Sequence, residues 1–512
     1  MDFSTLLNGF LQVFHLDNFI FIFLGVFIGI VFGAIPGLSG ALAMVIFLPF
    51  SFSLSPVVGI SMLMAIYCGG CYGGSVSAIL LGTPGSNEAA ATVLDGYPLA
   101  KRGYARKALE VALLASTIGG LLSSVALLFF APAISTLTLR FSSPEYFMLA
   151  IFGLSIISGV SGESLLKGLL AGCIGIMISM IGMDDLSGLS RFTFNNVNLL
   201  SGVNLIAMML GLFAIPVLVE KMENKEYELK LTEIVSMTNK EGVTKKEFKK
   251  IFPSIVKSSL IGIGIGALPG TGAAIASFIS YNEAKRSSKH PEEFGHGALE
   301  GIAAPEAGNN GVTAAALIPL LTLAIPGSAA VATLIGALMM HGLVPGPQLF
   351  QTQGATVYAI MFSIVIANIA MFAEGKVLAR FFAKVIQVPQ VILMPMLTIF
   401  CFAGAYAAKG TAFNILVLVI AGIASFALAK LGIPHVPLLL GVILGPIAET
   451  NLRNSLTLSN GSWLIFLTRP ISLAILALTI FLVILVKWQD QKLRRETGNA
   501  SDNSTGTYDE EA

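Results

Sequence analysis

Small polar side chains gather beside Pro-Gly pairs in otherwise apolar stretches of this 512-residue chain. Their hydroxyl and amide groups suit hydrogen bonding to carboxylate oxygens or coordination of a sodium ion. Pro-Gly interrupts a helix, so it frees N–H groups that attract anions at one new end and C=O groups that ligate cations at the other. The candidate substrate- or ion-binding residues are Pro36, Gly37, Ser39, Thr83, Pro84, Gly85, Ser86, Asn87, Pro269, Gly270, Thr271, Glu306, Asn309, Asn310, Pro326, Gly327 and Ser328.

The Pro-Gly pairs occupy matching positions in the two halves of the chain. Residues 29–37 and 262–270 both read G-x-x-x-G-x-x-P-G, and residues 82–86 have a counterpart in 324–328. The first pair is displaced by 233 positions and the second by 242, and the extra nine fit within the polar stretch 282–310. A single Pro-Gly is most often a kink. Breaks in paired positions favour a transport site between internal repeats, whose relative orientation the sequence leaves open.

The composition is that of a membrane protein. Hydrophobic residues make up 55% of the chain, charged residues 12%, and the mean hydropathy is +0.83, whereas soluble domains carry about 25% charged residues. We expect an all-α polytopic protein with about 10–12 transmembrane helices in two related repeats, with re-entrant segments broken at Pro-Gly. Residues 1–18 lack the basic region and cleavage site of a signal peptide, so we expect the first apolar run to stay in the membrane.

Charge divides the chain. Residues 1–220 are the predicted first membrane repeat, 221–252 a charged cytoplasmic linker, 253–486 the second repeat, and 487–512 a cytoplasmic polar tail expected to be disordered. Lysine and arginine concentrate in residues 95–107, 221–257 and 487–495, which the positive-inside rule places in the cytoplasm together with the C-terminus.

Individual acids and cysteines admit two interpretations. Glu306 lies near two amides and can bind a cation or a proton, whereas Glu88 is either a binding group or a solvated residue. Glu449 and Arg453 have the spacing of a structural helical ion pair. Cys68 and Cys71 lack a partner His/Cys pair and are expected to pack as small apolar residues, so the only metal we expect is Na⁺ near the Pro-Gly breaks.

Other function classes find less support. The chain has no H-E-x-x-H, G-x-S-x-G or Walker A motif, so we expect neither an enzyme nor ATP-driven transport. No continuous polar pore or ring of like charges is evident, which disfavours an ion or solute channel. A channel and a stand-alone carboxylate symporter remain the alternatives to a multi-subunit transporter.

Several segments together resemble the large membrane subunit of the tripartite tricarboxylate transporters, the TctA family. The resemblance extends over about residues 20–485 and rests on several motifs: GAIPG at 33–37, ILLGTPGS at 79–86, AAPEAGNN at 303–310, ALIPLLTLAIPGS at 316–328 and LGVILGP at 440–446, with RFTF at 191–194 and RPIS at 469–472.

This resemblance implies a bacterial inner-membrane permease subunit. It would work with a small, TctB-like membrane subunit and an extracytoplasmic, TctC-like solute-binding protein. It would import tricarboxylates such as citrate, or other carboxylates, driven by a Na⁺ or H⁺ gradient, with no cofactor beyond the coupling ion and no nucleic acid partner. The family fold implies two related repeats with an elevator-type movement. Residues 308 and 311–313 depart from the family pattern beside the expected pocket, so the carboxylate, the coupling ion and any homo-oligomer stay open.

Overall fold

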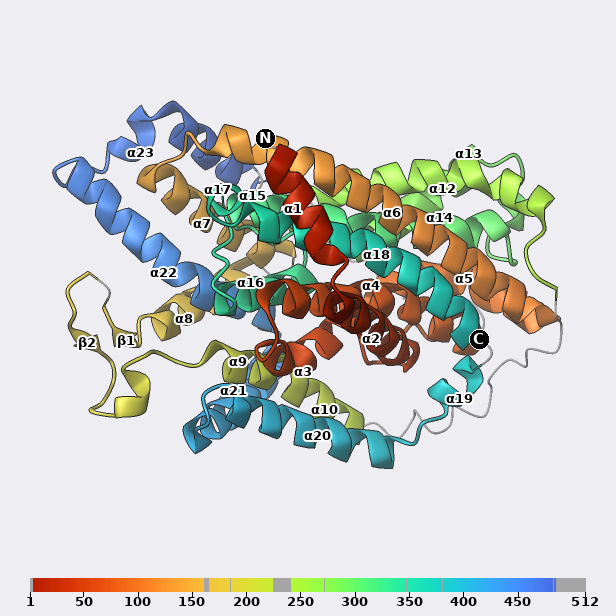
Figure 1. Cartoon of the computed structure of the whole chain (residues 1–512), viewed down its shortest axis with the longest axis horizontal. Coiled ribbons are helices and arrows are strands. Elements are labelled where there is room, and N and C mark those ends of the chain that lie inside the picture. Colours follow the sequence, from red (N-terminus) through yellow and green to blue (C-terminus); the bar gives the residue numbers. More distant parts are fainter. Residues whose placement is uncertain are drawn as a thin grey trace, which may run out of the picture. The chain divides into compact units, whose positions relative to one another are not determined.

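The chain forms two compact units that are each discontinuous in sequence. The structure, a computed structural model, describes residues 3–160, 165–184, 186–223, 241–270, 272–346, 348–379, 381–481 and 483–484. Unit 1 comprises Met1–Arg140 and Phe192–Lys430, and unit 2 comprises Phe141–Arg191 and Leu431–Ala512. Almost every element is a helix (Figure 1), as the composition predicts.

The elements of each unit follow in chain order. The first part of unit 1 contains α1 (Phe3–Val13), α2 (Leu16–Ala34), α3 (Gly40–Ser51), α4 (Pro56–Leu81), η1 (Asn87–Ala89), α5 (Ala90–Leu99), η2 (Ala100–Tyr104) and α6 (Ala105–Thr138). Its second part contains η3 (Val197–Leu199), α9 (Leu205–Met209), η4 (Leu210–Ala214), α10 (Ile215–Glu223), α12 (Lys245–Gly266), α13 (Gly272–Ser287), η6 (Pro291–Glu293), α14 (Leu299–Ala315), α15 (Leu317–Leu323), α16 (Ala329–Met340), α17 (Leu349–Thr352), α18 (Gly354–Leu378), α19 (Phe382–Ile386), α20 (Gln390–Ala407) and α21 (Ala412–Lys430). Unit 2 contains α7 (Ser143–Val160), α8 (Leu165–Ser179), the antiparallel strands β1 (Gly182–Met183) and β2 (Ser190–Arg191), α22 (His435–Leu458) and α23 (Ile465–Thr468).

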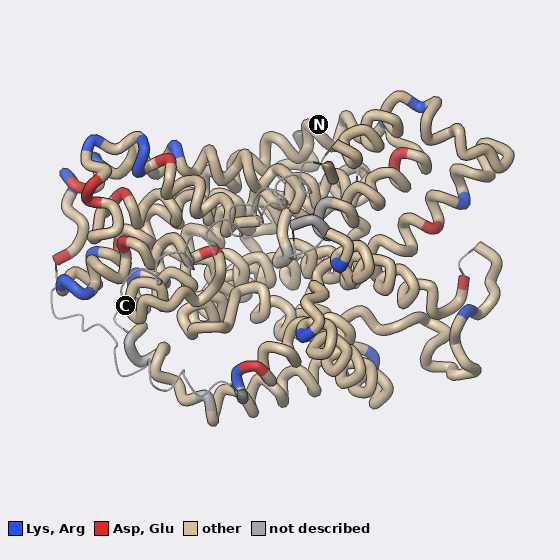
Figure 2. Tube along the Cα trace, turned by 180° about the vertical axis from the view of Figure 1, so that it is seen from behind, with Lys and Arg blue, Asp and Glu red and all other residues tan. Residues whose placement is uncertain are grey.

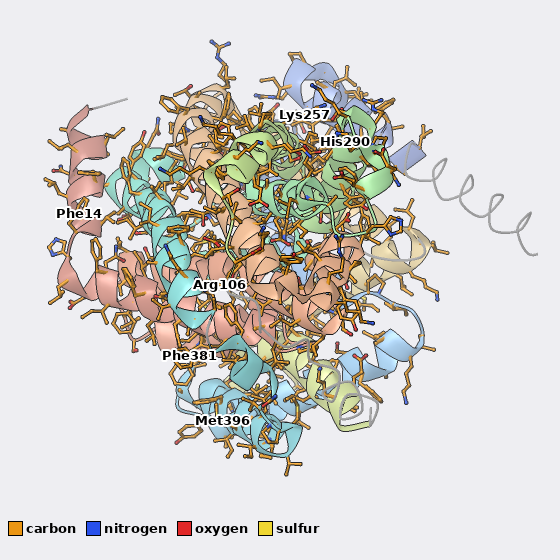
Figure 3. The ribbon with its side chains drawn as sticks, turned by 90° about the vertical axis from the view of Figure 1, so that its right-hand side faces the viewer. Phe14, Arg106, Lys257, His290, Phe381 and Met396 are labelled. Atoms are coloured by element: carbon orange, nitrogen blue, oxygen red, sulfur yellow. The ribbon has the colours of Figure 1, made fainter. Side chains whose placement is uncertain are left out.

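Long apolar helices confirm a polytopic membrane protein. Six helical stretches of the described residues are long and apolar enough to cross a membrane: Leu16–Ala34, Pro56–Leu81, Asn87–Thr138, Gly354–Leu378, Ala412–Lys430 and His435–Leu458. Large apolar side chains also cover the outside of the bundle. Phe14 is 53% exposed and Met396 is 46% exposed, and both are labelled in Figure 3. Lipid is the solvent that such a surface requires.

Glycines bring the central helices of unit 1 into close contact. Gly25, Gly29 and Gly33 repeat every four residues on α2 and face backbone carbonyls of α4. A Cβ on Gly25 would lie 2.5 Å from the Met62 carbonyl oxygen, and one on Gly29 would overlap the Ile66 oxygen. Small residues at this spacing allow helix backbones to approach in the membrane, where burial of apolar surface gives little drive. Helix α4 is thereby buried along almost its whole length.

Charged side chains concentrate towards the end of unit 1 where α6 and α12 begin (Figure 2). Lys107 Nζ lies 2.9 Å from Glu247 Oε1, and Glu110 Oε2 accepts the Val243 N–H at 3.0 Å. Thr244 and Glu247 form a capping box at the start of α12, which begins at Lys245. Burial raises the pKa of Glu247, but hydrogen bonds from Lys107 and Thr244 outweigh this effect and lower it to about 2. Two of the segments predicted to share one side of the membrane, 95–107 and 221–257, therefore meet; the third, with the tail 487–512, lies outside the described residues.

Unit 2 is held by a glycine contact and an ionic cluster. A Cβ on Gly175 of α8 or Gly441 of α22 would overlap a carbonyl oxygen of the other helix. At the end of α22, Arg453 lies 3.4 Å from Glu449, which confirms the predicted helical pair. Arg453 also binds Asp184 at 2.9 Å. Hydrogen bonds from Ser187 and Arg453 lower the pKa of Asp184. The cluster fixes the end of α22 to the β1–β2 hairpin.

Candidate functional site

The four paired Pro-Gly breaks predicted from the sequence lie in unit 1, between the end of one helix and the start of the next. They separate α2 from α3, α4 from η1 and α5, α12 from α13, and α15 from α16. The prediction that these pairs interrupt helices is confirmed. What each break exposes depends on its local geometry.

In the first half, the second break packs against the first. Gly37 and Gly82 have positive φ angles of 77° and 67°, which favour glycine. The Gly85 N–H donates to the Gly74 carbonyl oxygen at 3.2 Å. A Cβ on Gly85 would overlap the carbonyl oxygen of Gly33, near the end of α2. The turn after α4 is thus seated directly on the break in α2.

The second half has a similar but looser arrangement at the same displacements. Gly270 has a φ of 80°, and Ala324 takes a φ of 59° where the first half has Gly82. A Cβ on Gly327 would lie 3.0 Å from the Gly266 carbonyl oxygen and 2.8 Å from Ala316 Cβ. Gly266 and Ala316 stand at the positions equivalent to Gly33 and Gly74. A non-glycine residue in the left-handed region stores strain of about 1–2 kcal/mol.

The two halves also interlock. Helix α3 of the first half contacts α16 of the second, while α5 of the first half contacts α13 of the second. The central helices α4 and α14 touch each other between these pairs. Ser39 caps α3 by accepting the Leu42 N–H at 3.2 Å, and Ser328 caps α16 by accepting the Val331 N–H at 3.2 Å. Ser39 and Ser328, both predicted site residues, therefore act as helix N-caps in the structure.

Glu306 of α14 is a fully buried carboxylate surrounded by neutral donors. Thr92 donates to it at 2.5 Å and Ser116 at 2.9 Å, from α5 and α6. Ser75 of α4 also interacts with it. Among the described residues no basic side chain forms an ion pair with Glu306. A buried carboxylate without a fixed counter-ion needs a proton or a cation for neutrality.

Further buried polar atoms near the breaks have no hydrogen-bond partner. In the part of the chain that the structure describes, these are Tyr67 Oη, Ser86 Oγ, both amide atoms of Asn309, and Asn310 Oδ1. Tyr67 is 1% exposed and Asn309 is fully buried. Burying a polar group without a partner costs about 1–3 kcal/mol, so such a concentration indicates a site completed by a ligand or water.

The remaining predicted residues differ in their surroundings. Pro36, Gly270 and Pro326 are buried, whereas Thr83, Pro84 and Pro269 are half-buried and Asn87 is exposed. Glu88 is partly buried, with its Oε2 3.7 Å from Cys71 Sγ. Thr271 lies outside the described residues. Cys68 and Cys71 are buried free thiols.

Sequence reasoning missed Thr92 and Ser116, which donate to Glu306, and two further contributors that reach the breaks from distant parts of the chain. Lys221 at the end of α10 donates to the Pro36 carbonyl oxygen, so an ammonium group occupies the free C=O end of the first break. Tyr67 lies near Ser328, although 261 positions separate them. An unusual lysine at the end of an apolar run could have suggested the first contact, and no local signal marks the second.

A cavity of about 510 Å³ in the described part of the chain is lined by none of the break residues. It is lined by the start of α6, the start of α12 and residues 293–300. Polar groups of its lining bind one another: Arg102 donates to the His296 carbonyl oxygen at 2.8 Å, and Lys107 forms an ion pair with Glu247. Asp95 Oδ1, fully buried, accepts the N–H groups of Gly295, Gly297 and Ala298. These bonds hold residues 295–298, in the polar stretch 282–310, against the end of α5.

Comparison with known families agrees with this architecture. The sequence model described as the tripartite tricarboxylate transporter TctA family matches residues 19–440. The chain belongs to the TctA family. The matched range includes the four paired Pro-Gly breaks and Glu306.

Two relatives of this TctA-family protein come from Agrobacterium vitis. One, named an uncharacterized 52.8 kDa protein in the TAR-I ttuC' 3' region, is 34% identical over 494 residues, covering 96% of this chain and 98% of the relative. Another, named an uncharacterized protein in the TAR-II ttuC' 3' region, is 37% identical over 232 residues, covering 45% of this chain and 96% of the relative. No solved structure matches the chain.

Proposed function

We propose that this TctA-family protein is the permease subunit of a binding-protein-dependent secondary transporter that imports citrate-like tricarboxylates or other carboxylates. The observation that carries the proposal is the set of four helix breaks with similar geometry around buried, unpartnered hydroxyl and amide groups. Helix N-termini and neutral donors attract a carboxylate without the strong binding of a fixed arginine. Moderate affinity permits release on the other side of the membrane.

Glu306 is the proposed site of the coupling ion. A proton would neutralise its carboxylate directly. A sodium ion would take oxygen ligands from Glu306, Thr92 and Ser116. The Thr92 hydroxyl lies 2.5 Å from one Glu306 carboxylate oxygen, and the Ser116 hydroxyl lies 2.9 Å from the other. At the first break the Lys221 ammonium already occupies the carbonyl end, which favours Glu306 over that break as the cation site.

The matched halves support an internal repeat and an alternating-access movement of elevator type. The tripartite family in general implies a small TctB-like membrane subunit and an extracytoplasmic TctC-like binding protein. We assign the protein to the bacterial inner membrane. Its charged end at α6 and α12 would face the cytoplasm, because lysine and arginine favour that side.

Reconstitution in proteoliposomes with the small membrane subunit tests the proposal. Uptake of labelled citrate and other carboxylates would be measured with and without the binding protein, and with an inward gradient of either Na⁺ or H⁺. We expect saturable uptake that requires one of the two gradients. Uptake without the binding protein would indicate a stand-alone symporter, whereas passive ion flux without carboxylate uptake would indicate a channel and refute the proposal.

A further inference from the structure

Tyr67 carries a deeply buried phenol hydroxyl. It lies in the middle of α4 and is 1% exposed, and its Oη makes no hydrogen bond of ordinary geometry with any described residue. Among its neighbours is Ser328, the N-cap residue of α16. Ser328 Oγ accepts the Val331 N–H at the N-terminus of this 12-residue helix. The N-terminus of α16 therefore offers backbone N–H donors, and the Tyr67 phenol adds a hydroxyl donor beside them. Aromatic packing alone would be served by phenylalanine.

The equivalent positions of the other half repeat this arrangement. A displacement of 242 relates Tyr67 to Asn309 and Ser86 to Ser328. Asn309 is fully buried with both amide atoms unpartnered, and Ser86 Oγ is unpartnered too. The short helix η1, which follows Ser86, contacts α14, the helix of Asn309. Each central helix thus brings one orphan polar side chain towards the second break of the opposite half.

Residues close to the two orphan groups meet where α4 contacts α14. Cys68, next to Tyr67, interacts with the side chain of Thr313. Thr313 lies one helical turn beyond Asn309, on the same face of α14. A single small molecule at this crossing could therefore reach both groups.

We propose that Tyr67 and Asn309 bind two carboxylate groups of one substrate, Tyr67 together with Ser328 and the N-terminus of α16, and Asn309 together with Ser86. The proposal rests on the carboxylate transport proposed above and narrows its substrate class. Both Tyr67 and Asn309 can donate to a carboxylate oxygen, and neither makes a hydrogen bond of ordinary geometry with a described residue. The site would select short di- and tricarboxylates over monocarboxylates, because a single carboxylate leaves one donor set buried and unpaired.

Tyr67→Phe is the informative variant. It removes only a hydroxyl that makes no described hydrogen bond, so folding should not suffer. Tyr358→Phe on α18 is the matched control, since Tyr358 is also buried but packs against Phe350, away from the breaks. Ligand-induced thermal stabilisation of the purified protein and competition for uptake by the reconstituted complex would be measured with citrate, succinate and butyrate.

We expect Tyr67→Phe to weaken citrate and succinate binding about 10-fold or more, the effect of losing a hydrogen bond to a charged group. Weak butyrate binding should change far less, so the preference for succinate over butyrate falls. Asn309→Ala should do the same, and the double variant should bind succinate no better than butyrate.

Two results would overturn the inference. One is a Tyr67→Phe protein with wild-type affinity for all three acids, and the other is an equal loss for succinate and butyrate, which indicates a general structural effect. Failure of the wild-type complex to bind any carboxylate would instead refute the proposed function, so the two failures are distinguishable.

Discussion

The contact between the breaks of each half predicts a graded response to the addition of one methyl group. In Gly327→Ala the new Cβ would meet Ala316 Cβ at 2.8 Å and the Gly266 oxygen at 3.0 Å. Both distances are well below ordinary contact, and the neighbours belong to backbone or to a side chain that cannot rotate away. Overpacking of this kind costs about 1–3 kcal/mol. In Gly85→Ala the Cβ would overlap the Gly33 carbonyl oxygen, so we expect about 3 kcal/mol or more.

Gly264→Ala is the matched control. Gly264 lies on the exposed face of α12, five residues before Pro269, and a Cβ there meets nothing within 4 Å. Alanine is the better helix former by about 0.5–1 kcal/mol, so this variant should be neutral or slightly more stable. The three variants share the chemical change and differ chiefly in the space around it, with a small gain in helix propensity at Gly264 alone.

Thermal unfolding in detergent, followed by size-exclusion chromatography after heating, would rank the variants. We expect midpoints in the order Gly264→Ala, Gly327→Ala, Gly85→Ala from highest to lowest, with losses of a few degrees per step. Carboxylate uptake should follow the same order, because each added methyl group displaces the serine that follows the break. Equal stability of Gly85→Ala and Gly264→Ala would refute the packing of one break upon the other.

Three further perturbations follow from the buried and capping carboxylates. Glu306→Gln keeps the shape of the side chain but removes its negative charge, so gradient-driven uptake should be abolished while the thermal midpoint stays within a few degrees; undiminished coupling would exclude Glu306 as the ion site. Asp95→Ala removes the acceptor of three backbone N–H groups and should lower the free energy of unfolding by about 3 kcal/mol or more. Limited proteolysis should then detect early cleavage at 295–298, and an unchanged digestion pattern would contradict this prediction. The folded-state pKa of Glu247 is depressed from 4.5 to about 2, so its contribution to the stability of the start of α12 is present above pH 4.5 and is lost as the pH falls towards 2. Hydrogen-exchange protection at the start of α12, measured relative to the intrinsic exchange rate at each pH, should fall over this range in the wild type but not in Glu247→Gln, where the acid-dependent part is absent.

The helix breaks show how far local sequence information reaches. Long apolar runs predicted membrane helices, and Pro-Gly predicted their interruption, because hydropathy and backbone hydrogen bonding are properties of a few consecutive residues. The pairing of Glu449 with Arg453 was predictable for the same reason, since helical spacing alone brings them together. The polar candidates beside the breaks were identified as a set, but their individual environments were not.

Contacts between distant segments were decided by tertiary packing. Thr92 and Ser116 reach Glu306 only because α5 and α6 pack against α14, and Lys221 reaches Pro36 from the end of α10. The hydroxyl contacts to Glu306 have no sequence signal, since hydroxyl groups are common in many other roles, and the position of Lys221 in the sequence does not name its partner.

The sequence by itself therefore determined the class of protein, the family and the positions where helices break. Only the tertiary structure decided which breaks meet, which polar atoms remain unpartnered and which carboxylate is buried without a counter-ion. The physical reason is that glycine-mediated approach of helix backbones, as between α2 and α4, sets the register of segments far apart in the chain. That register places Tyr67 beside Ser328 and leaves Asn309 with no acceptor of its own.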